Sequence, residues 1–394
     1  MAGPGEVDLL AIVAPRRRAA DLVRDAWDAG DAVTVIDPAA PAATVARVLA
    51  TVAPTHLVDL DGRHPLSDGL PAPAGTAAVV VTSGTTGTPK GVELTVEGAI
   101  AIGHGWAGTM GHRPTDHWLL TLPLHHVAGL AILARSRVTG ADVTIVEGFD
   151  LDEVGGAPGR FGATLVSVVP TMLGRLLDAG APMHEYRGVV TGGAPVPPAL
   201  RARADALGVP VFDAYGQSET WGGCVANGRP IPGAAVRLGP ADEIEISGPM
   251  VMRDYRRDPE ASRRAFTHDG WLRTGDVGRF APDGRLEVVD RLRDLIISGG
   301  VNVSPVEVEQ VLAEHPAVAD VAVVGAPDAE WGERVVAHVV PADPTSPPSL
   351  DDLRAFTRER LTAAKLPREL VLVREVPRSP GGKILRRELR DPTA

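Results

Sequence analysis

The first 60 residues alternate short apolar runs with amphipathic stretches, and this alternation limits the chain to few folds. The apolar runs have the composition of buried strands, and the stretches between them repeat apolar residues at helical spacing. Because parallel strands need a long crossover, such alternation is typical of a parallel sheet covered by helices. Strands are predicted at residues 9–13, 33–36, 57–60, 77–82, 164–169, 188–191 and 209–212, and helices at residues 17–29 and 42–52.

The pattern changes near residue 243, where short β segments separated by turns replace the longer alternation. The chain after residue 294 predicts a separate small α/β unit that ends in a basic tail. We place a boundary near residues 290–294, which divides the chain into a domain of residues 1–291 and a second domain of residues 292–394. The later strands are predicted at residues 243–247, 278–280, 286–289, 318–324 and 333–340, and the later helices from Ser304 and at residues 350–361.

Composition excludes several classes of protein. The formal net charge is −11, so a basic nucleic-acid-binding face is not expected. The single cysteine, Cys224, excludes an internal disulfide and a multi-cysteine metal site. No apolar run is long enough for a membrane helix, and near the N-terminus the charges follow the apolar run, the reverse of a signal peptide. We expect a cytoplasmic globular protein with no nucleic-acid partner and no membrane insertion.

The strongest chemical signal is the segment TSGTTGTPKG at residues 82–91, which follows a predicted buried strand. Glycines let the backbone approach an anion, hydroxyl and amide groups bind phosphate oxygens, and a lysine adds charge. The Walker A pattern does not fit, because Pro89 replaces its second glycine and Gly91 follows the lysine. The alternative is a flexible surface turn. The predicted phosphate-binding residues are Thr82, Ser83, Gly84, Thr85, Thr86, Gly87, Thr88 and Lys90.

Lysine is rare in this chain, which gives weight to each one that occurs. Of the 39 basic residues only three are lysines, Lys90, Lys365 and Lys383, so 39 − 3 = 36 are arginines. An arginine-rich chain that keeps a lysine in a glycine-rich motif suggests that the compact ammonium group is needed there. Lys90 and Lys383 lie in such motifs, whereas Lys365 has no role that the sequence indicates.

The loop at residues 82–91 resembles the signature of the adenylate-forming enzymes, which include acyl- and aryl-CoA ligases, luciferases and peptide-synthetase adenylation domains. The other motifs of that family follow in order, so the resemblance covers about residues 77–390. It implies an α/β fold with a large N-terminal domain of helix-covered mixed sheets plus a distorted β part, and a small mobile α+β C-terminal domain. The N-terminal part is shorter than in most members. The resemblance also implies ATP, Mg²⁺ and coenzyme A as cofactors.

Two motifs in the middle of the chain resemble the adenine and phosphate contacts of that family. Tyr215 would stack on adenine, Ser218 would contact the α-phosphate, and Glu219 would hold Mg²⁺, a hard cation that prefers oxygen ligands. A core aromatic beside a turn is the alternative for Tyr215. The residues that the resemblance assigns to the nucleotide here are Gly193, Ala194, Pro195, Asp213, Tyr215, Gly216, Gln217 and Ser218, and those assigned to the acyl group are Gly192, Gly216 and Thr220.

Three later motifs complete the resemblance. Asp276 in GWLRTGD would bind both ribose hydroxyls, because a carboxylate accepts two hydrogen bonds. The segment DRLRD implies that Arg291 also contacts the ribose and that Asp294 is the hinge, and Gly299 and Gly300 would line the thiol tunnel. In SPGGKI, Lys383 would stabilise charge at the α-phosphate. The alternatives are a solvated turn for Asp276 and a surface lysine for Lys383.

The acyl pocket is indicated by LPLHHVAG at residues 122–129, where His126 takes the position at which the family gates access. Two adjacent histidines also allow a metal site, although neighbouring side chains do not share a face. Arg135 lies in a helix-like segment whose other inward residues are apolar, and the alternative is a helix-surface arginine. Trp221 stands where a smaller residue is expected, and Cys224 is expected to be a small pocket or core residue.

Two local stretches, residues 122–136 and 215–238, resemble the o-succinylbenzoate–CoA ligases of menaquinone biosynthesis. That acid carries two carboxylates, so its pocket needs a cation for the one that does not react, and Arg135 is the candidate. Alternatives are a ligase for another aryl or short to medium acyl acid, and a non-catalytic nucleotide-binding protein on the same fold. The expected partners are a small carboxylate, ATP and CoA, with a homodimer left open.

Overall fold

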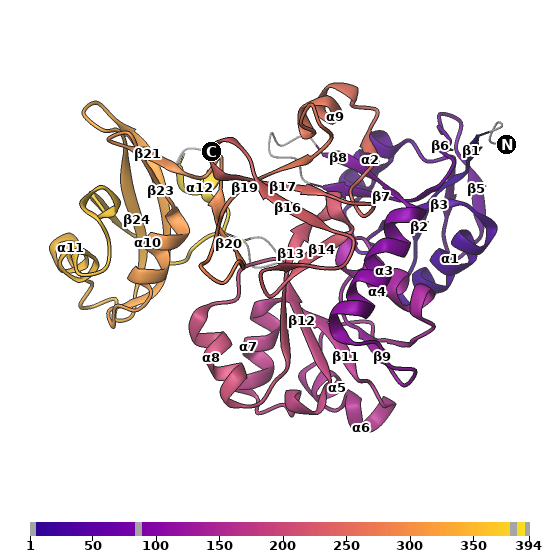
Figure 1. Ribbon diagram of the computed structural model, residues 1–394, viewed down its shortest axis with the longest axis horizontal. Coiled ribbons are helices and arrows are strands. Elements are labelled where there is room, and N and C mark those ends of the chain that lie inside the picture. Colours follow the sequence, from indigo (N-terminus) through magenta and orange to yellow (C-terminus); the bar gives the residue numbers. More distant parts are fainter. Residues whose placement is uncertain (1–4, 83–88, 379–383, 391–394) are drawn as a thin grey trace. The chain divides into compact units, whose positions relative to one another are not determined.

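The computed structural model describes residues 5–82, 89–378 and 384–390, and the chain divides into two compact units. Unit 1 comprises Met1–Arg237 and Glu245–Arg273, and unit 2 comprises Leu238–Ile244 and Thr274–Ala394. Figure 1 shows both, coloured along the sequence from indigo to yellow. No helix among the described residues is both long and apolar enough to cross a membrane.

Unit 1 contains two seven-stranded mixed sheets and a short strand pair, β1 (Glu6–Val7) with β6 (Ala72–Pro73). The first sheet has the order β18 (Asp254–Arg256), β8 (Lys90–Thr95), β7 (Thr76–Thr82), β3 (Ala32–Ile36), β2 (Leu9–Val13), β4 (His56–Val58) and β5 (Arg63–Pro65). The second has the order β10 (Asp142–Ile145), β9 (His117–Leu120), β11 (Leu165–Val168), β12 (Gly188–Gly192), β13 (Val211–Gln217), β14 (Gly222–Ala226) and β15 (Arg229–Pro230).

The helices of unit 1 cover these sheets, as the ribbon in Figure 1 shows. Helices α3 (Val96–Met110) and α4 (Val127–Thr139) pack on each other; α3 contacts strands of both sheets, and α4 contacts β9, β10 and β14. Arg135, a buried residue of α4, therefore lies deep inside the unit. The other helices are α1 (Arg16–Ala29), α2 (Ala42–Val52), α5 (Leu151–Gly155), α6 (Ala157–Phe161), α7 (Pro170–Asp178), α8 (Pro198–Ala206) and α9 (Pro259–Ala265).

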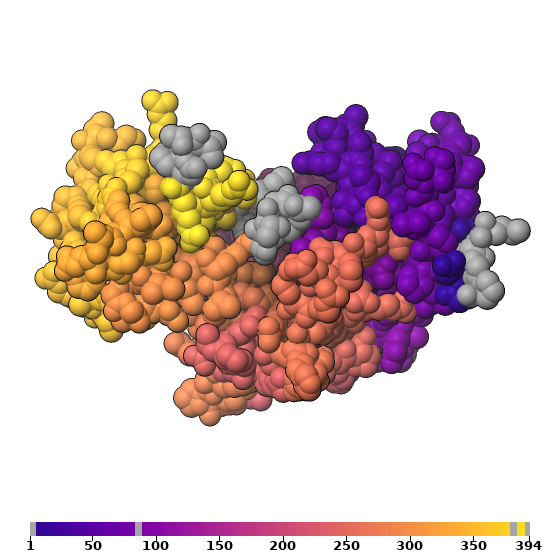
Figure 2. Space-filling model, turned by 90° about the horizontal axis from the view of Figure 1, so that it is seen from above, coloured from indigo at the N-terminus to yellow at the C-terminus, as the bar shows by residue number. Residues whose placement is uncertain are grey.

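Unit 2 is built around a sheet of order β22-β21-β24-β23, with β25 paired to β24. Its core is rich in valine, which suits strands because β-branched side chains pack well on a pleated surface. In Figure 2 the yellow C-terminal segments of the unit lie directly against its own orange segments. The elements are β19 (Leu272–Phe280), β20 (Leu286–Arg291), β21 (Ile296–Ser298), β22 (Val301–Val303), β23 (Val318–Asp328), β24 (Gly332–Pro341), β25 (Glu369–Leu372), α10 (Pro305–Leu312), α11 (Leu350–Arg358) and α12 (Arg386–Arg390). Strands β16 (Ala235–Leu238) and β17 (Glu243–Ser247), like β19, include residues of both units.

The predicted strand–helix alternation is confirmed, since β2, α1, β3, α2 and β4 follow one another and the three strands pair in parallel. Three predicted strands need a correction. β13 begins at Val211 rather than at residue 209 and runs on to Gln217, so Asp213 and Tyr215 lie on the strand and not after it. β19 begins at Leu272 rather than at residue 278, and β4 ends at Val58 rather than at residue 60. The second compact unit takes up the chain continuously from Thr274, after unit 1 ends at Arg273. The predicted boundary between residues 291 and 292 concerns which residues move together as a domain, and it stays a prediction.

Candidate active site

The predicted phosphate loop connects two antiparallel strands. Thr82, the last residue of β7, pairs with Lys90, the first residue of β8, so the two ends of the loop lie side by side. The ammonium group of Lys90 lies 4.5 Å from the centre of the Tyr255 ring, a cation–π contact. The six predicted phosphate-binding residues from Ser83 to Thr88 lie outside the described residues.

The second part of the candidate site lies where the parallel strands β12 and β13 end together. Gly192 is opposite Ala214, and a Cβ atom on Gly192 would lie 3.0 Å from the Ala214 carbonyl oxygen. Gly193 has a φ of 85°, a backbone conformation that residues other than glycine rarely adopt. The strand pairing therefore brings Gly192 and the following residues Gly193, Ala194 and Pro195 next to the motif that begins at Asp213. Burial raises the pKa of the Asp213 carboxyl group.

A tight turn after β13 orients the next motif residues. A Cβ atom on Gly216 would lie 2.0 Å from the carbonyl oxygen of Gly222, so only glycine fits there. The Gln217 N–H donates to the Thr220 hydroxyl at 3.0 Å, and that hydroxyl donates to Gly222 O at 2.7 Å. Thr220 is fully buried, so its hydroxyl holds the turn, while Tyr215, Gln217 and Ser218 are half-buried. An acyl contact by Thr220 stays a prediction.

Glu219 is buried, and its Oε1 accepts a hydrogen bond from the Tyr255 hydroxyl at 2.7 Å. Among the described residues no group of three or more His, Cys, Asp or Glu could hold a metal ion by itself. Mg²⁺ is usually bound by one or two carboxylates together with substrate phosphates and water, so a single buried Glu219 fits this ion. The sequence interpretation missed Tyr255; its rarity, as one of three tyrosines in the chain, was the available signal.

Trp221 adopts a left-handed conformation with a φ of 53° and is fully buried. Its indole N–H donates to the Thr95 carbonyl oxygen at 3.0 Å. A Cβ atom on Gly98 would lie 2.7 Å from the Trp221 ring, so the ring packs against the first turn of α3. Cys224 is also fully buried, and burial raises its pKa to about 12, which fits the predicted core residue and not a nucleophile.

His126 precedes the first residue of α4, and its ring centre lies 4.4 Å from that of His125. Burial lowers the pKa of His126 to about 4, and His125 contributes to this shift. His126 is therefore neutral at pH 7. The metal alternative finds no support among the described residues, because no cluster of three ligands includes either histidine.

Arg135 lies on α4 and is buried, so the alternative of a helix-surface arginine is wrong. Its guanidinium carbon lies 4.5 Å from the Trp106 ring centre and 5.4 Å from that of Trp118. Its Nε has no hydrogen-bond partner in the part of the chain that the structure describes. The three side chains line a cavity of about 20 Å³, which holds one water molecule at most. Burial lowers the pKa of Arg135 to about 9, so it remains a cation at pH 7.

The predicted ribose residues are brought together within unit 2. Asp276 and Arg291 are opposite each other on β19 and β20, and Arg291 Nε lies 2.7 Å from Asp276 Oδ1. The carboxylate of Asp276 is buried, while the Arg291 side chain is 32% exposed. The pairing agrees with the prediction that both residues contact one ligand group.

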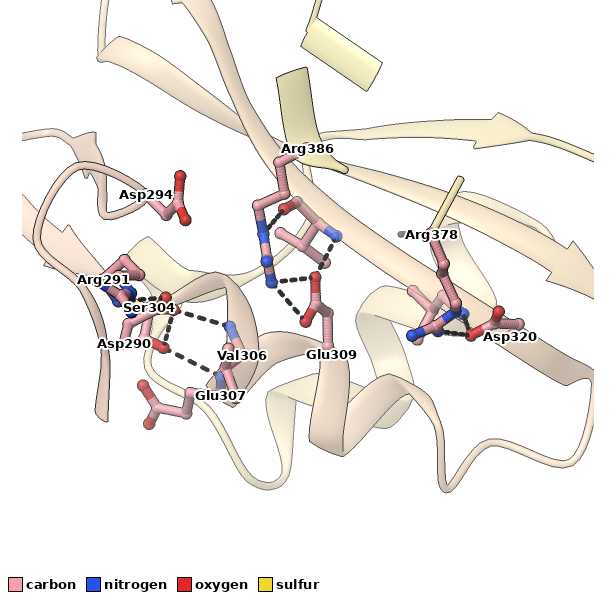
Figure 3. A network of polar contacts seen from close by, with 12 residues as sticks. Asp290, Arg291, Asp294, Ser304, Val306, Glu307, Glu309, Asp320, Arg378 and Arg386 are labelled. Carbon is pink, nitrogen blue, oxygen red and sulfur yellow. Dashed lines mark hydrogen bonds and ion pairs between the residues drawn. The ribbon is translucent and has the colours of Figure 1, made fainter. Parts of the chain in front are cut away.

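The predicted hinge lies at the start of the C-terminal sheet (Figure 3). The carboxylate of Asp290 accepts hydrogen bonds from the Ser304 hydroxyl at 2.6 Å and from the Val306 N–H at 3.1 Å, so it holds the first turn of α10. Asp294 is buried, and its N–H donates to Arg291 O at 2.9 Å. The role of Asp294 as the pivot stays a prediction.

Gly299 and Gly300 form the two-residue turn between β21 and β22, with φ values of 59° and 78°. Two positive φ values in a two-residue hairpin favour glycine at both positions. A Cβ atom on Gly299 would also lie 2.8 Å from the Trp331 ring. These local requirements account for the glycine pair, and a contact with the thiol of CoA stays a prediction.

Lys383 lies outside the described residues, but both ends of the segment that carries it are anchored. Arg378 and Ile384 form an antiparallel bridge, and Arg378 Nη2 lies 2.8 Å from Asp320 Oδ1. Arg386 Nη2 lies 2.7 Å from both carboxylate oxygens of Glu309, an almost buried ion pair that Figure 3 shows. Burial raises the pKa of Glu309, and Arg386 opposes this shift.

Lys365, to which the sequence assigned no role, is part of an ion pair within unit 2. Its ammonium nitrogen lies 2.7 and 2.6 Å from the two carboxylate oxygens of Glu307 on α10. This pair is partly exposed, so its contribution to stability is small. It accounts for Lys365 without a role in the reaction.

Residues 11–256 match the family model described as AMP-binding enzyme, and residues 307–383 match that of the AMP-binding enzyme C-terminal domain. The first match alone covers more than half of the chain. This chain belongs to the AMP-binding enzyme family. Membership confirms the predicted adenylate-forming fold, with its mixed sheets and its C-terminal domain.

Among the relatives of this AMP-binding enzyme is the 2-succinylbenzoate–CoA ligase of Bacillus subtilis. The two are 36% identical over 338 residues, which cover 80% of this chain and 69% of the relative. The structure of o-succinylbenzoate CoA synthetase (MenE) from Bacillus subtilis in complex with the acyl-adenylate intermediate OSB-AMP matches with a TM-score of 0.87 at 29% identity, over 98% of this chain and 88% of that one. The same synthetase in complex with ATP and magnesium ion matches with a TM-score of 0.85 at 29% identity, over 98% and 90% of the two chains.

Proposed function

We propose that this chain is an ATP-dependent acid–CoA ligase that converts o-succinylbenzoate to o-succinylbenzoyl-CoA in menaquinone biosynthesis. A carboxylate is a poor electrophile, so ATP first converts it to an acyl-adenylate with release of pyrophosphate, and CoA then displaces AMP. The observation that carries this proposal is the similarity, at 36% identity over 80% of the chain, to a 2-succinylbenzoate–CoA ligase. The buried cation Arg135 agrees with an acid that keeps one carboxylate after the reaction.

The proposed nucleotide contacts come from the phosphate loop, the motif that begins at Asp213, and the pair Asp276 and Arg291. The loop from Thr82 to Lys90 binds the phosphates, Tyr215 stacks on adenine, and Ser218 contacts the α-phosphate. Asp276 and Arg291 bind the ribose, and the 2.7 Å contact between them fixes the carboxylate that accepts the hydroxyl hydrogens. A side chain at Gly216 would collide with the Gly222 carbonyl oxygen, so the glycine there lets the strand and the following turn pack closely beside the proposed adenine site.

Charge balance decides the first step, since negative charge grows at the α-phosphate as the carboxylate attacks. When bound, Mg²⁺ neutralises phosphate charge, and Glu219 is the residue that would hold it. Lys90 and Lys383 supply positive charge from the protein. His126 is neutral at pH 7, so it can line the path of the acyl group and the thiol without attracting the phosphates.

The second step needs Lys383 to leave and the thiol of CoA to enter. We propose that residues 292–394 turn about Asp294 as one domain, a hinge motion that alternates the two half-reactions. Residues 274–291 would then stay with the first domain, although they are compact with the second in this structure. Gly299 and Gly300 would line the entry of the thiol. We further propose that the enzyme is cytoplasmic, because ATP and CoA are its co-substrates. A homodimer is compatible with this proposal.

One assay tests the function. Pyrophosphate release is measured with o-succinylbenzoate, benzoate and medium-chain fatty acids, with and without CoA. We expect the highest kcat/KM with o-succinylbenzoate. A higher value with another acid would favour the alternative, a CoA ligase for another aryl or short to medium acyl carboxylate. Measurable ATP binding without release of pyrophosphate from any acid would favour a non-catalytic nucleotide-binding protein on the same fold.

Replacing Arg135 separates substrate binding from folding. Arg135→Leu is expected to raise KM for o-succinylbenzoate by about 10- to 100-fold, because a hydrogen bond to a charged group is lost, and to leave KM for benzoate unchanged. The small cavity beside Arg135 means that neighbouring side chains must move to admit the carboxylate. Because Arg135 is buried without an ion-pair partner among the described residues, thermal unfolding should show equal or higher stability for the leucine variant. Equal KM changes for both acids would contradict the assignment.

A further inference from the structure

Tyr255 lies between two proposed ligand-binding residues that are far apart in the sequence. Its hydroxyl donates to Glu219 Oε1 at 2.7 Å, and its ring faces the ammonium group of Lys90, which lies 4.5 Å from the ring centre. The tyrosine comes from β18, Glu219 from the turn after β13, and Lys90 from β8. One side chain therefore joins two separate parts of the candidate site within unit 1.

The backbone around Tyr255 is held firmly. Tyr255 is opposite Val92 in the pairing of β18 with β8, and its N–H donates to the Ser262 hydroxyl at 2.9 Å. The next residue, Arg256, is buried and donates to Val52 O at 2.5 Å and to the carboxylate of Glu93 at 3.0 Å. These contacts fix the backbone position from which the Tyr255 side chain extends.

The position of Tyr255 has an electrostatic consequence. An ammonium and a carboxylate group close together form an ion pair, which would neutralise the two charges that phosphate and Mg²⁺ need. Among the described residues no carboxylate pairs with Lys90, and the aromatic ring occupies one side of its ammonium group.

We infer that Tyr255 is a positioning residue that keeps Glu219 and Lys90 apart, with one carboxylate oxygen held and the other left for Mg²⁺. The inference rests on the proposed function, because Glu219 must serve the metal and Lys90 the phosphates. Tyr255 itself touches neither ligand in this scheme. Its effect should therefore appear in the binding of metal-bound nucleotide and not in that of AMP.

The test compares two tyrosines whose hydroxyl groups each donate a hydrogen bond, one inside the candidate site and one outside it. Tyr255→Phe removes the hydroxyl and keeps the ring below Lys90. Tyr186→Phe is the matched control, because the Tyr186 hydroxyl also donates one hydrogen bond, to Val154 O at 2.6 Å, in a separate hydrophobic core. Titration calorimetry measures Kd for ATP with Mg²⁺, for ATP without metal, and for AMP, on the full chain.

For Tyr255→Phe we expect Kd for ATP with Mg²⁺ to rise about 10- to 100-fold, as the loss of a hydrogen bond to a charged group predicts. Kd for AMP and for metal-free ATP should stay within about twofold, within the usual variation for distant sites. Tyr255→Leu, which also removes the ring, should weaken metal-free ATP as well, because Lys90 becomes free to pair with Glu219. Tyr186→Phe should leave all three values unchanged.

Two results would overturn the inference. Wild-type affinity of Tyr255→Phe for ATP with Mg²⁺ would show that the hydroxyl does not position Glu219. An equal rise of all three Kd values would show a structural role only, and AMP binding shows at the same time that the variant is folded. A Glu219→Gln variant separates the inference from the proposed function: if its binding of ATP stays equally dependent on Mg²⁺, the metal role of Glu219 is refuted and the role of Tyr255 with it.

Discussion

Lys383→Ala is expected to lose most of its adenylation activity and to convert a preformed acyl-adenylate to the CoA thioester at close to the wild-type rate. Removing one preorganised donor to developing charge costs about 10²- to 10³-fold in kcat. If residues 292–394 turn about Asp294 as proposed, this loss is confined to the first half-reaction, because Lys383 then leaves the site before the thiol attacks. Pyrophosphate release measures the first half-reaction, and thioester formation from synthetic adenylate measures the second.

Lys365→Ala is the matched control, since it removes another lysine of the same unit. Its ion pair with Glu307 on α10 is partly exposed, so we expect both half-reactions to stay near wild type. Equal loss of both half-reactions in Lys383→Ala would refute domain alternation. In that case Lys90 and Lys383 would act from one fixed arrangement in both half-reactions.

Arg256→Met is expected to lower the free energy of unfolding by about 3–5 kcal/mol, the cost of leaving one member of a buried ion pair alone. The guanidinium of Arg256 donates to Val52 O, to Leu70 O and to the carboxylate of Glu93, at 2.5, 2.5 and 3.0 Å. Methionine replaces the volume but not the donors, so the buried carboxylate of Glu93, the buried carbonyl group of Val52 and the carbonyl group of Leu70 lose a partner. Urea denaturation measures the change.

The neighbouring residue provides the control. Arg257 is exposed and donates to a single carbonyl oxygen, that of Ala50, at 2.7 Å. Because Arg257→Met also keeps a side chain at this left-handed position, it should change the unfolding free energy by less than about 1 kcal/mol. Similar losses in both variants would mean that the buried contacts of Arg256 contribute little. Arg256→Met should also weaken ATP binding with Mg²⁺, because Arg256 holds the strand that carries Tyr255.

Local patterns predicted much of the fold. The helix α2 begins and ends at the predicted residues, and Ser304 caps α10 as expected, because periodicity and capping are properties of neighbouring residues. The pairing of Asp276 with Arg291 agrees with a motif order that the family shares. The contacts of Tyr255 could not be predicted in this way. They join β18, β8 and the turn after β13, and nothing in the local sequence fixes which strands become neighbours.

For Arg135 the sequence pattern predicted burial but not the neighbouring side chains. Its inward position followed from the apolar residues around it on α4, and its burial is confirmed. That its charge lies between two tryptophan rings depends on α3 and β9, which pack on α4 in three dimensions only. The conformation of Trp221 was also beyond local pattern, because a positive φ at a tryptophan is held by tertiary contacts.

The hairpin that joins Thr82 to Lys90 has a consequence for the way this enzyme attracts phosphate. In loops that lead from a strand into a helix, the partial positive charge of the helix N-terminus comes with the backbone. Here the chain leaves the loop as strand β8, and sheets have only small net dipoles. A discrete side-chain charge such as that of Lys90 then takes the place of a helix dipole at this point, and salt screens it. In the proposed reaction this charge acts together with Lys383 and Mg²⁺, so the lysine that this arginine-rich protein keeps here is one of several contributions to phosphate affinity.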